Sequence, residues 1–389
     1  MSAFAAVMTG RGTGAIATIQ LVGDETPAIL ANVFRRSGEK PLESATGRIL
    51  LGHIFDGADD IDRVTVGCES PDVLAIHCHG NPLIVERIMG LLQRNGVKLL
   101  TAEQLLTKTF AAQLSSNSIA AEAKLALITV KTIAGAEILA HQIESGLSAK
   151  IEQWRQELDT RPLSQIAAEA QHILRASEPA RLLISGCTIA LIGPPNTGKS
   201  TLLNTLAGRE KAIVTDVRGT TRDWVSAQIH ISPLAATVID TAGLDSSLAS
   251  GGEIDRAAQQ KTIEIVDRAD LVLLILDAGQ PADQLSQVVA DMLLNKRTIV
   301  VLNKADLPER FESGSLPSHV GQPVRISAKE GIGIEDLILA IHQACKLADF
   351  DARAAVVFTS RQRVLMERLT ATESRYHADT LMADLLHGW

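Results

Sequence analysis

Between residues 183 and 349 the chain alternates short apolar runs with amphipathic stretches. Short apolar runs bounded by turn residues are typical of strands buried on both faces, and the stretches between them have helical spacing. The pattern predicts strands at 188–192, 224–230, 235–240, 271–277, 298–302 and 324–326, and helices from 199 and at 256–267, 281–295 and 334–346. We therefore expect an α/β fold with a mostly parallel sheet covered by helices on both faces.

Helical spacing dominates the two segments that flank this α/β domain. Residues 115–182 predict two or three packed helices, with a 3.6-residue period through Ile119, Ala123, Leu127, Val130 and Ile133. A second helical stretch runs from Ser360 to Leu386. We expect 115–182 and 350–389 to form one helical domain, into which the α/β domain of 183–349 is inserted.

Residues 1–114 mix strand-like runs, such as Ala15–Val22 and Val73–His77, with a helix-like stretch at Pro82–Gln93. This mixture predicts a small α+β N-terminal domain. The glycine-rich segment Gly10-Arg-Gly-Thr-Gly14 resembles a phosphate loop, but it precedes a strand instead of following one. We expect it to be the turn that opens the N-terminal sheet.

The amino-acid composition indicates a globular protein with aliphatic cores. The 389 residues are 46% apolar and only 3% aromatic, and two or three domains are expected at this length. The net charge of −8 argues against a protein that coats nucleic acid, although a local basic patch could still bind RNA. Two interpretations remain for the basic side chains of the last helical stretch: contacts with RNA phosphates, or a solvated face paired with acids. These side chains are Arg361, Arg363, Arg368 and Arg375.

The cysteines indicate a reducing, cytoplasmic location. Cys68, Cys78, Cys187 and Cys345 form no C-x-x-C pair, so neither a disulfide framework nor a zinc site is expected. The run His77-Cys78-His79 could bind a metal, but on a strand its side chains alternate between faces, which favours a structural role. No apolar span approaches the ~20 residues of a membrane helix, so no membrane association is expected.

The sequence Gly193-Pro-Pro-Asn-Thr-Gly-Lys-Ser200 lies between a predicted strand and a predicted helix. The spacing G-x-x-x-x-G-K-S places backbone N–H groups around a phosphate chain at a helix N-terminus. Lys199 is expected to reach the β and γ phosphates, and the Ser200 hydroxyl to face Mg²⁺. The remaining residues expected in this cradle are Asn196, Thr197, Gly198 and Thr201.

Three further motifs at strand ends predict that the nucleotide is GTP. In Asp240-Thr-Ala-Gly243, Asp240 can hold Mg²⁺ through water and the Gly243 N–H can contact the γ-phosphate. In Asn303-Lys-Ala-Asp306, a buried Asp306 would accept from guanine, Lys304 would lie over the ring, and adenine would leave the carboxylate unpaired. In Ser327-Ala-Lys329, a backbone N–H would reach guanine O6.

The loop Thr215-Asp-Val-Arg-Gly-Thr-Thr221 lies between the first two motifs. We expect Thr221 to complete the Mg²⁺ shell; the alternative is a plain turn before the next strand. Leu244 occupies the position where many GTPases carry a water-orienting glutamine. Catalysis must therefore come from another group.

These motifs resemble the G domain of the tRNA-modification GTPases called MnmE or TrmE. The similarity extends through Ala212–Asp223 and includes Thr359–Arg363, Gly10–Ala17 and Cys78-His-Gly80. It implies that Asn196 helps hold a K⁺ ion, together with Thr215, Val217 and Thr220. In the family, a carboxylate of an E-x-E pattern positions the attacking water. The resemblance implies that Asp255 has this role here, with Glu253 as a possible substitute. It also implies that Lys199 and Thr220 assist catalysis.

The resemblance has departures outside the G domain. The positions of an arginine, a glutamate and a lysine that hold folate in the family match Gln20, Ala75 and approximately Leu114, so loss of folate binding is expected. The chain ends in Ala383–Trp389 without the family's Cys-Ile-Gly-Lys tail. Two functions stay open. One is a homodimeric, Mg²⁺-dependent and K⁺-stimulated GTPase acting with a flavoprotein partner in tRNA wobble-uridine modification; the alternative is a GTP-gated assembly switch without modifying activity.

Overall fold

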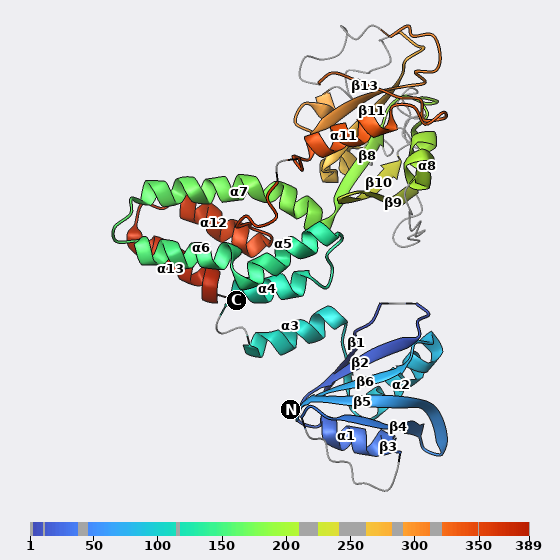
Figure 1. Ribbon diagram of the computed structural model, residues 1–389, viewed down its shortest axis with the longest axis vertical. Coiled ribbons are helices and arrows are strands. Elements are labelled where there is room, and N and C mark those ends of the chain that lie inside the picture. Colours follow the sequence, from blue (N-terminus) through green and yellow to red (C-terminus); the bar gives the residue numbers. More distant parts are fainter. Residues whose placement is uncertain are drawn as a thin grey trace, which may run out of the picture. The chain divides into compact units, whose positions relative to one another are not determined.

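The computed structural model describes residues 3–10, 12–37, 46–113, 117–209, 225–240, 262–281, 291–311, 321–348 and 350–388 (Figure 1). The chain divides into two compact units, residues 1–117 and 118–388, and each is considered separately. No helix among the described residues is long and apolar enough to cross a membrane.

The N-terminal unit is built on a seven-stranded sheet with the order β3-β4-β5-β6-β2-β1-β7 among the described residues. Its neighbouring strands pair antiparallel except for β1 with β7. The strands are β1 (Phe4–Val7), β2 (Ile16–Val22), β3 (Phe34–Arg36), β4 (Ile49–Asp56), β5 (Asp59–Ser70), β6 (Val73–His79) and β7 (Lys98–Leu99). The helices are α1 (Thr26–Val33), α2 (Pro82–Arg94) and α3 (Ala102–Gln113).

Alternation of buried and exposed residues along these strands gives the sheet two different faces. Ile19, Leu50, Val66 and Ile76 point to a core that also contains Ile88 of α2. The opposite face carries polar side chains together with exposed Ile16, Ile49 and Leu51. The predicted strands and helix are confirmed, but the segment Gly10–Gly14 connects β1 to β2 instead of opening the sheet, because Phe4–Val7 already forms a strand before it.

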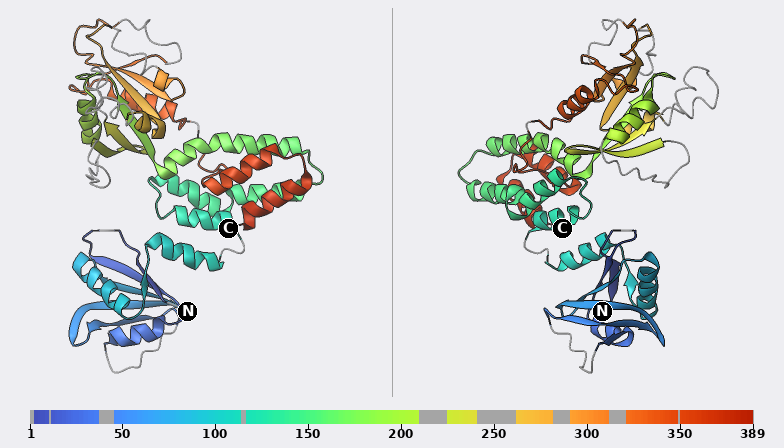
Figure 2. Two further views of the ribbon diagram at one scale, coloured as in Figure 1. Left: turned by 180° about the vertical axis from the view of Figure 1, so that it is seen from behind. Right: turned by 45° about the vertical axis from the view of Figure 1, so that its right-hand side comes forward.

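The helical part of the second unit combines segments from both sides of the α/β domain. The helices are α4 (Ser118–Ala126), α5 (Ile133–Glu144), α6 (Gly146–Glu157), α7 (Leu163–Ser185), α12 (Ser360–Ala371) and α13 (Arg375–His387). Trp154, Ile173, Met366 and Met382 share one hydrophobic core, so helices from the two segments pack together. Figures 1 and 2 show α12 lying beside α7.

The expectation of two or three helices in residues 115–182 is wrong, because four form between Ser118 and Ser185. The apolar period through Ile119 to Ile133 spans a turn between α4 and α5. Ile133, the last member of that period, is 82% exposed at the start of α5. Thr132 ends the turn and caps α5, accepting a hydrogen bond from Gly135 N.

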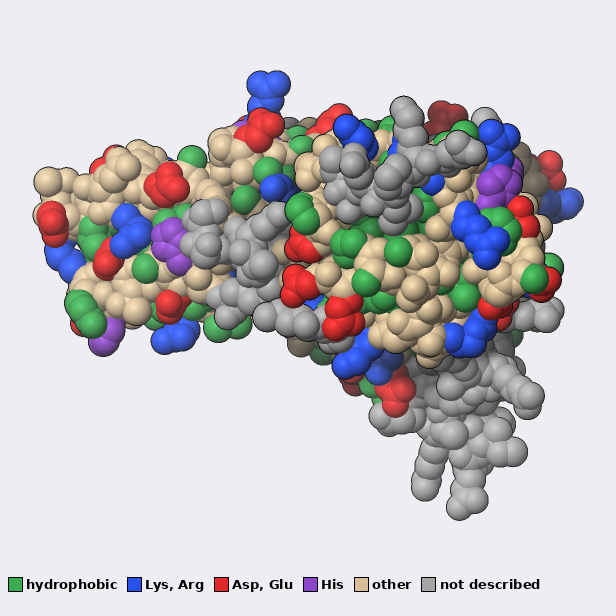
Figure 3. All heavy atoms as spheres, turned by 90° about the horizontal axis from the view of Figure 1, so that it is seen from below, with side chains coloured by type: hydrophobic (Ala, Val, Ile, Leu, Met, Phe, Trp, Pro, Cys, Tyr) green, Lys and Arg blue, Asp and Glu red, His purple; other side chains and the backbone are tan. Residues whose placement is uncertain are grey.

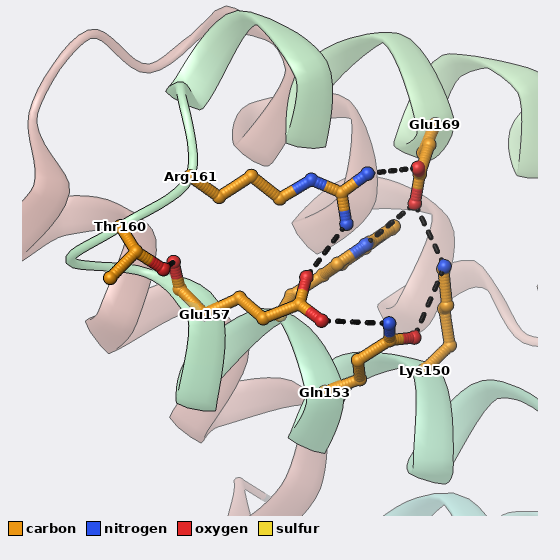
Figure 4. A network of polar contacts seen from close by, with 7 residues as sticks. Lys150, Gln153, Glu157, Thr160, Arg161 and Glu169 are labelled. Atoms are coloured by element: carbon orange, nitrogen blue, oxygen red, sulfur yellow. Dashed lines mark hydrogen bonds and ion pairs between the residues drawn. The ribbon is translucent and has the colours of Figure 1, made fainter.

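Polar networks fix the helices to one another. The buried Glu122 of α4 accepts hydrogen bonds from Arg361 and Gln362 of α12, and Arg361 also donates to the carbonyls of Asp384 and Leu385 in α13. Figure 4 shows a second network, in which Glu169 of α7 binds Lys150, Trp154 and Arg161. Hydrogen bonding by Lys150, with further donation by Trp154 and Arg161, lowers the pKa of Glu169 to about 2.

The α/β domain contains a six-stranded sheet with the order β13-β12-β11-β8-β10-β9 among the described residues. The strands are β8 (Cys187–Ile192), β9 (Val225–Ile231), β10 (Leu234–Asp240), β11 (Leu271–Asp277), β12 (Thr298–Asn303) and β13 (Val324–Arg325). All pair parallel except β9 with β10, which confirms the predicted α/β fold class. The helices described in full are α8 (Lys199–Arg209) and α11 (Ile334–Ala344).

Two hydrophobic cores lie on the two faces of this sheet. Alternate residues of β8 divide between them: Ile189 and Leu191 join the core that contains α8 and α11, and Ala190 and Ile192 join the other. The second core includes Ile265 and Val266, from the described end of the helix predicted at 256–267. Most of the helix predicted at 281–295 lies outside the described residues.

Candidate functional site

The loop between β8 and α8 is held close to two neighbouring strands. Gly193 has φ 151°, and a Cβ on it would lie 2.0 Å from the carbonyl oxygen of Ile275 in β11. Gly198 has φ 92°, and its Cβ would lie 2.2 Å from Nδ2 of Asn303. Both positions therefore require glycine, because of close approach as well as backbone conformation. Asn196, between them, also has a positive φ of 62°.

Lys199 is the first residue of α8 and its side chain folds back over the loop. Its Nζ donates to the carbonyl oxygens of Gly193 at 2.6 Å and Pro194 at 2.8 Å. The side chain is buried, so the ammonium group lies inside the curve of the loop. The N-terminus of α8 follows this loop directly, and the partial positive charge of a helix N-terminus makes this end of the helix suited to an anion.

The loop also brings a hydroxyl and a carboxylate together. Ser200 Oγ donates to Oδ2 of Asp240 at 2.7 Å, and Asp240 is buried at the end of β10. Hard oxygen donors of this kind fit Mg²⁺, which is usually bound by one or two protein oxygens together with phosphate oxygens and water. The donor set therefore suits the metal that the sequence predicted between these two residues.

Asn303 connects the three segments that surround the loop. At the end of β12, its Nδ2 donates to the carbonyl of Thr197 at 2.7 Å, and its Oδ1 accepts from Ala328 N at 2.9 Å. Both ends of the amide are thereby bound within the protein. The segment Ser327-Ala-Lys329 is held against the loop through this one side chain.

Lys304 and Asp306 follow Asn303 on the turn after β12. Lys304 Nζ binds Oδ2 of Asp277 at 2.6 Å. Asp306 is exposed on the solvent side of the turn. Hydrogen bonding from the Ser327 hydroxyl lowers the pKa of the Asp306 carboxyl, so the two predicted base-recognition segments are adjacent.

Asp277 was not predicted as a site residue. It is the register partner of Asn303 on the parallel strand β11, and its Oδ1 accepts from Gly279 N at 2.9 Å. A signal was present in the sequence, since Asp277 ends an apolar strand at the edge of the sheet where Asp240 and Asn303 also lie. In the structure its carboxylate holds the Lys304 side chain.

Several predicted site residues lie outside the described residues. These are Thr215, Val217, Thr220, Thr221, Gly243, Glu253 and Asp255. Among the described ones, Thr201 lies exposed in the first turn of α8, and Lys329 is exposed beside Glu330.

The positions matched to the folate charges lie on the N-terminal sheet. Gln20 and Ala75 are direct cross-strand partners on β2 and β6. Gln20 Nε2 donates to Glu69 Oε2 at 3.3 Å, and Ala75 is buried. Leu114 lies outside the described residues.

The His77-Cys78-His79 run has structural partners. Among the described residues no group of three or more His, Cys, Asp or Glu side chains is placed to hold a metal. Cys78 points into the core, where burial raises the pKa of its thiol to about 11. All four cysteines are free and buried.

Two of the three arginines of α12 form ion pairs with acids. Arg361 binds Glu122 and Arg363 binds Glu178. These ion pairs favour the interpretation of a helix face paired with acids. Acidic and basic side chains are also interspersed on the face shown in Figure 3.

Comparison with known proteins finds two family models and many full-length relatives. The model described as 50S ribosome-binding GTPase matches residues 188–304, and the model described as GTP-binding protein TrmE N-terminus matches residues 3–104. The tRNA modification GTPase MnmE of Endomicrobium trichonymphae is 32% identical over 86% of this chain and 79% of its own length. Those of Geobacter sulfurreducens and Thermotoga petrophila are 30% and 29% identical, over 94% and 95% of this chain and 87% and 88% of their own lengths.

Proposed function

This chain belongs to the MnmE family of tRNA modification GTPases, and we propose that it binds GTP with Mg²⁺ at the Gly193–Ser200 loop. The observation that carries the proposal is the convergence of Lys199, Ser200 with Asp240, and the Asn303 brace at the carboxyl edge of one sheet. Such an edge is where open α/β sheets bind ligands. Lys199 and the helix N-terminus would bind the phosphates.

Mg²⁺ bound here would neutralise the β and γ phosphates of GTP. Ser200 and Asp240 are the described residues that would hold it, directly or through water, and Thr221 would complete the shell. On binding, the Ser200 hydroxyl would turn from Asp240 to the metal. At the other end of the nucleotide, Asp306 would accept from guanine N1–H and the 2-amino group, and Lys304 would cover the ring. A backbone N–H of the segment Ser327-Ala-Lys329 would reach guanine O6.

Hydrolysis would depend on groups that complete the site when two G domains meet. We propose that Asn196 contributes to a K⁺ site with Thr215, Val217 and Thr220, and that Asp255 or Glu253 orients the attacking water. The positive φ of Asn196 supports this proposal, because few residues other than glycine adopt this backbone conformation and it is often found at functional sites.

A variant series tests the chemical roles. Asp255→Ala should abolish K⁺-stimulated turnover while GTP affinity stays within about twofold, and Glu253→Ala is the matched comparison. Turnover is measured by phosphate release, and affinity by fluorescence of a labelled nucleotide. If only Glu253→Ala lowers turnover, the water-positioning role moves to Glu253. If neither does, the proposal for both carboxylates fails.

In the cell, we propose that a cytoplasmic homodimer of this chain acts with a flavoprotein partner in the modification of tRNA wobble uridines. Membership of the MnmE family supports this role. A second function, a GTP-gated assembly switch without modifying activity, is favoured by one observation: the paired positions Gln20 and Ala75 carry no charge.

Wobble-uridine modification in cells with and without the gene separates these two functions. Loss of the modification on deletion and recovery on complementation would support the first. Normal modification in both strains would exclude it and leave the switch, whose GTP hydrolysis is measured separately on the purified protein.

A further inference from the structure

The open face of the N-terminal sheet carries a cluster of polar side chains far along the chain from the nucleotide motifs. Cross-strand partners form two neighbouring rows over β4, β5, β6 and β2. The first row is Leu51, Thr65, His77 and Thr18; the second pairs His53 with Arg63 and His79 with Ile16. Because alternate residues of a strand point to the same side, both rows belong to one surface.

A pocket of about 220 Å³ lies at these two rows. Its walls include the exposed apolar side chains Ile16 and Leu51, and its polar lining includes Arg63, Thr65, His77 and His79. Ligand sites commonly combine apolar walls with a few converging polar groups. The pocket therefore has the composition of a small binding site.

Both imidazoles in the pocket are oriented by a partner on Nδ1. The Asp62 carboxylate, whose side chain is 7% exposed, lies 2.6 Å from His79 Nδ1 and also accepts from His79 N at 2.8 Å. Thr18 Oγ1 lies 3.0 Å from His77 Nδ1. In the described part of the chain, Nε2 of each ring has no hydrogen bond, so it remains for a ligand.

Arg63 supplies a cation without a counter-ion. It makes no ion pair within the described residues, while the two nearest acids along β5 are already engaged: Asp60 with His53 and Asp62 with His79. In the next row, the neighbours of Thr65 and His77 on the same face are Gly67 and Ala75, which are small and pair with each other. That row leaves the His77 ring uncovered.

We propose that this pocket binds the oxyanion group of a small ligand. Arg63 is the charged donor, and the Thr65 hydroxyl and the Nε2 atoms of His77 and His79 are the further donors. His77 donates from Nε2 when Thr18 donates to its Nδ1, and His79 donates in its protonated form, whose charge Asp62 balances. Ile16 and Leu51 favour a carboxylate on a short aliphatic body over a bare phosphate.

The test uses the full chain saturated with GDP and Mg²⁺, so that the nucleotide site is filled, and labelled with ¹³C at histidine Cε1. Isovalerate and inorganic phosphate are titrated separately, and ring signals are assigned with His77→Gln and His79→Gln. We expect the His77 and His79 signals to shift together with one affinity. Arg63→Gln should weaken that affinity about tenfold, since it removes a charge-assisted hydrogen bond.

Arg87→Gln is the matched control, because Arg87 pairs with the exposed Asp59 and does not line the pocket. It should leave the affinity unchanged, and thermal unfolding like that of the parent protein would show that each variant folds. Tighter binding of isovalerate would identify a carboxylate as the ligand group, and tighter binding of phosphate would identify a phosphate; both support the oxyanion site. The proposal is overturned if neither anion shifts the His77 and His79 signals, or if Arg63→Gln and Arg87→Gln bind alike.

Discussion

Single residues in the phosphate loop are constrained by partners distant in the sequence. Gly198 must be glycine because its α-carbon faces the amide of Asn303, which is itself held between Thr197 and Ala328. The sequence motif predicted that Gly198 and Asn303 belong to one site. It could not predict that the amide of Asn303 braces the loop, because that contact depends on how β12 is placed against α8.

Gly198→Ala should therefore disrupt the loop. The added methyl group would meet Asn303 at 2.2 Å and hold a strained positive φ, which costs on the order of 1–3 kcal/mol. We expect GDP affinity to fall at least about tenfold and thermal stability to decrease. Gly208→Ala is the control, because Gly208 lies exposed in α8 with nothing within 4 Å of the added carbon, and it should stabilise by about 0.5–1 kcal/mol. Equal nucleotide affinity in the two variants would contradict this account.

Asp277 and Asp306 show what single residues in the sequence do not specify. Asp277 belongs to no motif, yet its register with Asn303 places its carboxylate beside Lys304. Asp306 is exposed, whereas its proposed contact with guanine requires shielding from water. Its exposure is a property of the turn, which the local sequence does not specify.

Helices and strands of this protein were predictable where an apolar pattern continued without interruption. β11 begins and ends where the sequence predicted it, since seven consecutive residues from Leu271 to Asp277 form a strand buried on both faces. The number of helices between residues 115 and 182 was not predictable from apolar spacing. The spacing continues through the turn before Thr132, and only the capping hydrogen bond at Thr132 marks the new helix.

The pairing of α4 with α12 depends on one buried carboxylate. Glu122→Ala would leave Arg361 without its bidentate partner, and breaking such a pair costs roughly 3–5 kcal/mol. We expect the free energy of unfolding to fall by that amount. It is measured by urea titration with Trp154 fluorescence as the signal, in a background with Trp224 and Trp389 replaced by Phe. Glu152→Ala, at an exposed position of α6, should change stability by less than about 0.5 kcal/mol. A similar loss in both variants would show that Glu122 has no special role.

The contact between α6 and α7 should respond to acid through Glu169. Its pKa is lowered from 4.5 to about 2 by Lys150, Trp154 and Arg161, so its stabilisation is present above pH 4.5 and is lost as the pH falls towards 2. Because the side chain is 35% exposed, we expect only about 1 kcal/mol.

Glu169→Gln should remove that contribution. Its stability deficit relative to the parent protein should be greatest above pH 4.5 and should vanish near pH 2, in unfolding curves measured across this range. A deficit that stays constant with pH would assign the effect to lost packing rather than to charge.

At the scale of the whole molecule, the α/β domain interrupts a helical domain whose two parts still meet. Ala180, Leu183 and Ile184 of α7 share a core with Leu347 and Phe350, which lie where the chain returns from the α/β domain. Packing between these residues therefore holds the start and the end of the α/β domain close together. Which surfaces would meet in a homodimer was not predictable from the sequence, because pairing between copies leaves no periodic signal.

Replacement of residues 188–345 by a short Gly/Ser linker should leave the helical domain folded. Its cores contain no side chain from the removed segment, and Ile184 and Leu347, near the two ends of the gap, lie in one hydrophobic cluster. We expect helical circular dichroism and cooperative thermal unfolding. A chain with the same residues removed and residues 350–388 also deleted should lose that cooperativity, because α12 and α13 complete the core. An uncooperative first variant would show that the α/β domain is needed for the fold.

The bond between Glu122 and Gln362 joins residues 240 positions apart, and it sets an order of events during protein synthesis. At a translation rate of about 5–20 residues per second, the Glu122 carboxylate leaves the ribosome roughly 10–50 s before its partners are made. In that interval the α/β domain is synthesised, while α4 to α7 lack the residues of α12 and α13 that complete their hydrophobic core. In the nascent chain, the α/β domain is therefore synthesised in full before the helical domain is complete.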